Sequence, residues 1–443
     1  MKTRLVPVYF STADDPDFVK QVQNLKKILS DEAEILSPAA LGKNFPPDAD
    51  AVVFPQMLGD AYRRVDEIRA IKLPILVITS EFGTVSMWDW EINNYLASLG
   101  ITVLAPYNLE QARQICRSIS LKKEMKAAKF LVYQDNPGEG FQADIFKRFY
   151  WWEEECIANL KKKFGFTLVK KSFKEMAARA KAIPDSQAEA VWDTLKGRMP
   201  VSGIANRSVL SSVKVYMTVR DELDKDPAIV SAGINCLNES AYSDSTPCLA
   251  WNILFEDRKI VWGCEADLVS MVTKVLVHKA LNVPFMMTNL YPFLMGMAAL
   301  KHEKISGFPE VESHPENHVL MAHCGYLGVV PQSFSSQWAL KEKVLAIVDE
   351  NANAIDARLP EGRVTLLKLM PPFDTFSVVE GELEKYAQFP GSDCRNGAVV
   401  RVANGHRMVK ELASHHYIVT MGDNLPALEY LASIFGMDCR VLQ

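Results

Sequence analysis

The stretch Trp262–Leu276 reads WGCEADLVSMVTKVL, and it decides the fold around it. Its first residue ends a short segment, Lys259–Trp262, that is typical of a β-strand. From Leu268 onward, apolar residues recur three and four positions apart, as they do on one face of an α-helix. The stretch therefore predicts a strand that turns directly into a helix, with the carboxylates Glu265 and Asp267 at the turn.

The same alternation of strand and helix extends toward the N-terminus. A short apolar run at Phe130–Tyr133 and another at Ile229–Ile234 predict strands, and Pro247–Phe255 is expected to be one as well. Strands that alternate with helices form parallel sheets covered on both faces. Nearer the N-terminus the pattern predicts a helix at Phe18–Leu29 and strands at Leu5–Phe10, Ala51–Phe54, Leu76–Thr79 and Ile101–Leu104.

The sequence pattern changes near residue 300, where strand-like runs separated by turn residues dominate. This pattern is typical of an antiparallel barrel or sandwich. We therefore expect an α/β protein with two parallel-sheet, Rossmann-like domains (1–122 and 123–300), followed by a mostly antiparallel β-barrel domain (301–443). The runs in question are His318–Ala322, Val364–Met370, Thr375–Glu380 and Ala398–Val402.

Composition excludes several classes of protein. The net charge of −5 lacks the basic field of a nucleic-acid-binding protein. The longest apolar stretch, Val283–Leu300, is interrupted by two prolines and an asparagine, so we expect no membrane-spanning segment. The N-terminal apolar run is too short for a signal peptide. The eight cysteines show no C-x-x-C pair, which indicates reduced thiols and a cytoplasmic location.

Three carboxylates follow predicted strands and are candidates for a site. Glu265 and Asp267 lie between a strand and a helix, where they can reach a metal ion or act as acid and base. The alternative is that Asp267 caps the helix and Glu265 faces solvent. Glu239 follows the strand Ile229–Ile234 and fits a site or a loop equally well.

Histidines near strand ends are the other candidates. His323 ends the run HVLMA and precedes a Cys-Gly pair, and His415-His416 precede a strand. Adjacent residues on an extended chain point to opposite faces. We therefore expect only one histidine of the pair to enter a site, and we discount a His323–Cys324 dyad.

Four motifs in this order (CEAD, PFMMTNL, HCG and SHHYIV) are similar to the L-fucose isomerase and L-arabinose isomerase superfamily, from about residue 236 to the end. The resemblance implies that Glu265 and His416 are metal ligands and that His323 lies at the metal or substrate. The family's next ligand is an acid about two dozen residues after the glutamate. Here that place is taken by Asn289, which becomes the third candidate ligand.

The resemblance also implies an activity. Members bind a divalent metal, usually Mn²⁺, and interconvert aldoses and ketoses through an ene-diol. They form trimers or hexamers, so we expect a homo-oligomer. Glu265 is the expected proton-transfer group, with Glu239 and Asp267 in reserve. The substrate is expected to be a monosaccharide, and deoxy, acidic and sulfonated sugars are among the candidates.

Asn289 raises a second hypothesis. An amide oxygen can bind a metal, but the amide cannot take up a proton at neutral pH. The chain is then a non-catalytic sugar-binding or regulatory relative. A third hypothesis, a thiol enzyme that uses Cys324 or Cys264, requires activity that survives metal chelation.

Overall fold

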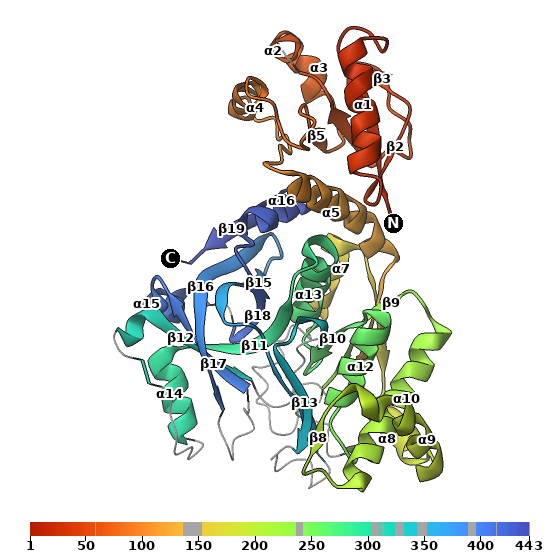
Figure 1. The fold of residues 1–443 in the computed structure, drawn as a ribbon, viewed down its shortest axis with the longest axis vertical. Coiled ribbons are helices and arrows are strands. Elements are labelled where there is room, and N and C mark those ends of the chain that lie inside the picture. Colours follow the sequence, from red (N-terminus) through yellow and green to blue (C-terminus); the bar gives the residue numbers. More distant parts are fainter. Residues whose placement is uncertain are drawn as a thin grey trace. The chain divides into compact units, whose positions relative to one another are not determined.

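The structure is a computed structural model that divides into two compact units (Figure 1). The first unit comprises residues 1–125, 279–281 and 426–436, and the second comprises residues 126–278, 282–425 and 437–443. The structure describes residues 1–442 except 58, 136–152, 236–241, 303–309, 312–313, 324–331, 343–351, 389–395 and 413.

The first unit is built on a parallel sheet with the strand order β2-β1-β4-β5. The short strand β3 pairs with the end of β1, and Leu104 adds a single parallel bridge to β5. The strands are β1 (Thr3–Tyr9), β2 (Ala33–Ile35), β3 (Ala39–Ala40), β4 (Ala51–Phe54) and β5 (Ile75–Val77). The helices are α1 (Pro16–Ile28), α2 (Asp60–Arg63), α3 (Val65–Arg69), α4 (Asp89–Ser98), α5 (Leu109–Ala127) and α16 (Leu425–Phe435).

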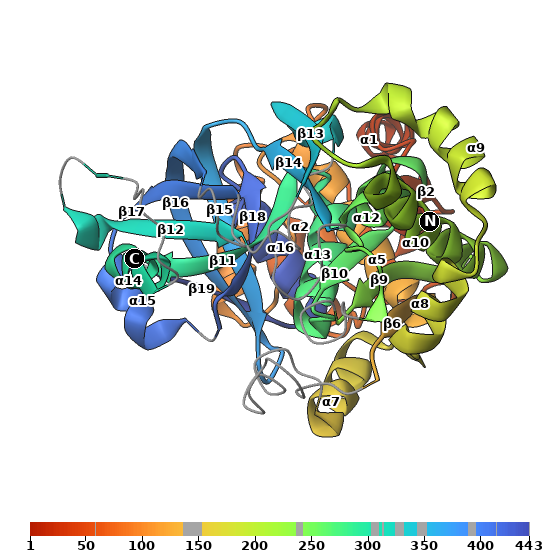
Figure 2. The same cartoon turned by 90° about the horizontal axis from the view of Figure 1, so that it is seen from below.

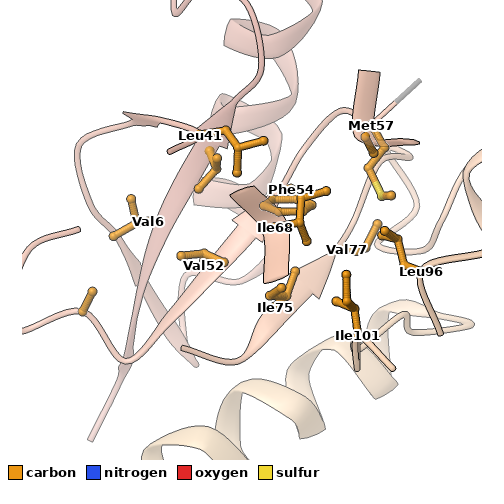
Figure 3. Packing of buried hydrophobic residues seen from close by; sticks show 13 residues of the cluster. Val6, Leu41, Val52, Phe54, Met57, Ile68, Ile75, Val77, Leu96 and Ile101 are labelled. Atoms are coloured by element: carbon orange, nitrogen blue, oxygen red, sulfur yellow. The ribbon is translucent and has the colours of Figure 1, made fainter. Parts of the chain in front are cut away.

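Apolar burial holds this sheet together. Figure 3 shows Val52 and Phe54 of β4 and Val77 of β5 packed against side chains such as Ile68 and Leu96. Every residue of β4 is buried, as expected for a strand that is covered on both faces.

The second unit begins with a four-stranded parallel sheet of order β10-β9-β6-β7. Its strands are β6 (Lys129–Tyr133), β7 (Thr167–Lys171), β9 (Ile229–Ile234) and β10 (Val261–Cys264). Its helices are α7 (Glu154–Phe164), α8 (Phe173–Lys181), α9 (Asp185–Leu195), α10 (Asn206–Lys225), α12 (Cys248–Arg258) and α13 (Leu268–Leu281), with the 3-10 turn η1 (Lys196–Arg198). A separate three-stranded sheet joins β8 (Val201–Ser202), β13 (Gln337–Glu342) and β14 (Asn353–Arg358).

The same unit contains a closed antiparallel barrel, which confirms the predicted fold class. Six strands pair in the order β15-β18-β11-β12-β17-β16, and β16 closes the barrel by pairing with β15. Figure 2 shows these strands grouped together, with α14 and α15 beside them. The strands are β11 (Phe285–Pro292), β12 (His318–His323), β15 (Gly362–Met370), β16 (Thr375–Gln388), β17 (Asn396–Val402) and β18 (His416–Met421), and β19 (Asp438–Val441) adds to β16 in parallel. The other elements are α14 (Phe293–His302), α15 (Gly405–Glu411), η3 (Pro315–Asn317) and η4 (Gln332–Phe334).

Two predictions about individual segments need correction. Pro247–Phe255, expected to be a strand, lies almost wholly within the helix α12. Residues 248–255 are all buried, so the segment is apolar on every side and shows no helical periodicity. Of the strand expected at Ile101–Leu104, only the bridge at Leu104 forms.

The three-domain limits remain a prediction. The first barrel strand, β11, begins at Phe285, ahead of the expected limit at residue 301. Over the described ranges, no helix is long and apolar enough to cross a membrane.

Candidate functional site

The junction between β10 and α13 is tight because two glycines allow the helix to approach the sheet closely. A Cβ on Gly263 would lie 2.2 Å from Cγ of Met271, and one on Gly233 would lie 2.9 Å from its sulfur. Real Cβ atoms do not come this close to other atoms, so a larger residue at either position would displace the Met271 side chain on α13. The glycines therefore leave room for Met271 next to the loop 264–267.

The loop itself has an unusual backbone. Glu265 and Ala266 have φ angles of +53° and +52°, the left-handed region that residues other than glycine rarely adopt. Two backbone hydrogen bonds hold the turn, from Ala266 N to Ile234 O (3.0 Å) and from Asp267 N to Cys264 O (3.0 Å). Strain of about 1 kcal/mol or more per residue is maintained here, as it often is at functional sites.

This turn brings both loop carboxylates into the interior. Glu265 is only 3% exposed, so the alternative in which it faces solvent is wrong. Asp267 is fully buried and caps α13, because its Oδ1 accepts a hydrogen bond from Ser270 N (2.9 Å). Capping and participation in the site are not alternatives here, because the second oxygen of Asp267 faces other groups.

Three side chains donate to that second oxygen, Oδ2 of Asp267. They are the hydroxyl of Ser270 (2.7 Å), Nδ1 of His416 (2.8 Å) and Nζ of Lys368 (3.2 Å). Burial opposes ionisation of Asp267. The Lys368 ammonium and the hydrogen bonds from His416 and Ser270 outweigh burial and hold the pKa of this carboxyl well below its usual range. Asp267 is therefore a carboxylate that only accepts hydrogen bonds.

His416 is oriented by this carboxylate. The residue is fully buried at the start of β18. Since the ionised Asp267 can only accept, Nδ1 of His416 must carry a proton, and a neutral ring then has its lone pair on Nε2. Nε2 lies 3.9 Å from Oε1 of Glu265. The pair resembles the carboxylate–histidine arrangement that orients metal ligands in many sites.

Asn289 lies next to His416, because the two residues are paired across β11 and β18. Its side chain is 7% exposed, and its Oδ1 accepts no hydrogen bond from any described residue. An amide oxygen that is buried without a donor is costly and suits a cation or a ligand hydroxyl.

The premise that His415 and His416 point to opposite faces is not met, and the expectation that only one of them enters the site remains a prediction. His415 precedes β18 in a bend, so the two side chains are not held on opposite faces of a strand. The ring centroids of His415 and His416 are 4.4 Å apart, and His415 also stacks on Tyr291. Burial, together with the nearby charge of Lys368 and that of His416 when protonated, lowers the pKa of His415 well below its usual value.

Two further candidates were predicted from the sequence, His323 and Glu239. His323 is the last residue of β12, where its backbone pairs with Asn396. Glu239 falls outside the described residues. The roles expected for both remain predictions.

Lys368 and Ser270 are members of the cluster that sequence reasoning missed. Lys368 is 1% exposed and stands alone in the apolar run VTLLKLM. A single charge in such a run was the available signal, because lysine is almost never fully buried unless it is paired. Burial lowers the pKa of Lys368, and the charge of Asp267 opposes that shift.

The donor set fits a divalent metal only with the amide included. Within the described ranges, no three His, Cys, Asp or Glu side chains are arranged to hold a metal ion. Glu265 offers a carboxylate, His416 a ring nitrogen oriented by Asp267, and Asn289 a buried oxygen that lacks a donor. Carboxylate, imidazole and amide oxygen are ligands that Mn²⁺ accepts.

Comparison with known proteins adds no family. No family model matches this sequence, and no curated protein matches it either. The resemblance to the L-fucose isomerase and L-arabinose isomerase superfamily therefore remains an expectation drawn from the four motifs.

Proposed function

We propose that this protein is a metal-dependent aldose–ketose isomerase that acts on a monosaccharide. The observation that carries the proposal is the buried arrangement of Asp267, His416 and Glu265. Nδ1 of His416 donates a hydrogen bond to Oδ2 of Asp267 at 2.8 Å, and Oε1 of Glu265 lies 3.9 Å from Nε2 of the same ring. The three residues come from two different strand ends, and such precise placement of buried polar groups is typical of sites that bind a ligand.

Glu265, Asn289 and His416 would hold the metal, for which Mn²⁺ is our choice. When bound, such an ion acts as a Lewis acid that polarises a carbonyl and acidifies the neighbouring C–H. Asp267 orients His416 and holds its Nδ1 proton. The left-handed turn orients Glu265, whose Oε1 is the atom that we expect to accept the proton from C2 and to deliver it to C1 of the ene-diol.

One observation favours a second candidate, a sugar-binding protein without turnover. Asn289 is buried and neutral, so the cluster lacks one negative charge and one possible base compared with the pattern that the resemblance implies. The unsatisfied Oδ1 of Asn289 would then accept a hydrogen bond from a sugar hydroxyl.

Two further expectations belong to this proposal. The cytoplasmic location is supported by the five cysteines among the residues that the structure describes, all of which are thiols rather than disulfides. A homo-oligomer is supported by exposed aromatic side chains in the first unit, such as Phe82 (74% exposed) and Trp88 (62% exposed). Sedimentation velocity of the full chain tests the oligomer.

The deciding experiment is proton exchange at C2, followed by NMR in D₂O. The protein is given a panel of aldoses, ketoses and acidic sugars with Mn²⁺ and then with a chelator. Chelator-sensitive loss of the C2 proton signal, with ketose formation, supports the isomerase. Glu265→Gln should abolish the exchange, whereas Glu382→Gln, on the barrel strand β16, should not. Binding of a sugar without exchange would favour the binding protein.

A further inference from the structure

Burial of the Lys368 side chain in the barrel costs free energy. It lies on the barrel strand β15 between Leu367 and Leu369, which are both fully buried. Its own side chain is 1% exposed. Removing an ammonium group from water costs several kcal/mol unless partners compensate, so its partners indicate what it does.

Both described polar partners of Lys368 belong to the cap of α13. Nζ donates to Oδ2 of Asp267 at 3.2 Å and lies 3.4 Å from the hydroxyl of Ser270. A protonated amine has three donors and no lone pair, so it is not a metal ligand. Because its described hydrogen bonds go to Asp267 and Ser270, Lys368 acts on the site through Asp267.

Capping of the helix does not require the lysine. The cap uses Oδ1 of Asp267, which accepts from the backbone N–H of Ser270 at 2.9 Å. The ammonium instead lies against Oδ2, the oxygen that also accepts from Nδ1 of His416 at 2.8 Å. Lys368 therefore stabilises the oxygen that orients the imidazole.

We propose that Lys368 is a positioning residue: it holds the Asp267 carboxylate so that Nδ1 of His416 keeps its proton and donates a hydrogen bond to Asp267, while Nε2 faces Glu265. Its importance for catalysis rests on the proposed isomerase function. The hydrogen bond between His416 and Asp267 does not depend on that function, so it can be measured by itself.

The test uses the full chain without metal, labelled with ¹⁵N in its histidines. A hydrogen-bonded Nδ1 proton gives a slowly exchanging proton resonance, which is assigned to His416 by its loss in His416→Gln. We expect this resonance in the unsubstituted protein, its loss or severe broadening in Lys368→Met, and its retention in Lys368→Arg. The matched control is Lys341→Met, which removes a lysine from another buried carboxylate, Asp356, 2.7 Å away. It should leave the resonance unchanged.

Two results would overturn the positioning role. One is a folded Lys368→Met variant with the same resonance. The other is an unsubstituted protein that shows no such proton on His416, which decides the question even if Lys368→Met does not fold. If the protein isomerises a sugar, Lys368→Met should lower kcat about tenfold with little change in KM, and Lys341→Met should change neither. Absence of sugar exchange in the unsubstituted protein would refute the proposed function and leave the NMR result standing.

Discussion

Replacing Asp267 by asparagine tests the buried cluster through its stability. The asparagine side chain has the same shape and caps helices as well as aspartate does, so the cap on α13 should survive. What is lost is the charge that faces Lys368, whose side chain is 1% exposed. Removing one partner of a buried ion pair typically costs 3–5 kcal/mol, because the other charge stays buried and uncompensated. We expect Asp267→Asn to lower the free energy of unfolding by about 4 kcal/mol.

The measurement is urea denaturation, with the cost taken from the shift in midpoint at a common slope. A double-mutant cycle with Lys368→Met sharpens it. Once both charges are gone, neither is left uncompensated. The loss of unfolding free energy in the double variant should therefore be smaller than the sum of the two single losses by about 2 kcal/mol or more. The effect should also be insensitive to salt, because buried pairs are poorly screened.

Asp356→Asn is the matched control. Asp356 is 2% exposed and pairs with Lys341 at 2.7 Å, but the side chain of Lys341 is 35% exposed and can turn to water. Asp356→Asn should lower the free energy of unfolding by less than half as much as Asp267→Asn does. The reasoning is refuted if Asp267→Asn costs less than about 1 kcal/mol, or if its loss and that of Lys368→Met are simply additive.

Three further predictions concern separate features. Asn289→Asp adds a charge to the candidate ligand set and should tighten Mn²⁺ binding about tenfold by calorimetric titration; weaker binding would argue against Asn289 as a ligand. Gly263→Ala should destabilise the protein by about 1–3 kcal/mol, because the new Cβ would lie 2.2 Å from Cγ of Met271, and shortening Met271 in the same chain should recover part of that loss. Two opposite effects act on the pKa of Glu222: burial raises it, but Lys171 and Arg179 lower it more strongly, from 4.5 to about 2. Because the pKa is depressed on folding, this pair network stabilises the protein above about pH 4.5 and loses that contribution as the pH falls toward 2. The loss should be about 2 kcal/mol after allowance for partners that are 40% and 46% exposed, and Glu222→Gln should flatten this part of the pH–stability profile.

Part of this protein could be predicted from its sequence because local chemistry decides it. The alternation of apolar runs and helical stripes predicted the α/β texture and the barrel, and it placed Glu265 and Asp267 between β10 and α13. The end of the strand and the start of the apolar helical stripe locate the loop in the sequence, but not its backbone conformation. The same method failed at α12, where burial on every side removes the periodicity that separates a helix from a strand.

Only the tertiary structure decided which side chains meet. Lys368 and His416 lie about a hundred residues or more beyond Asp267 in the sequence, and strand pairing in the barrel, not local pattern, brings them to one carboxylate oxygen. Next to the left-handed turn at Glu265, glycines in two neighbouring strands leave room for the Met271 side chain of α13. Sequence periodicity reports which face of one element is apolar. The partners of a buried charge depend on how distant elements pack, and for this reason the cluster around Asp267 could be seen only in the folded chain.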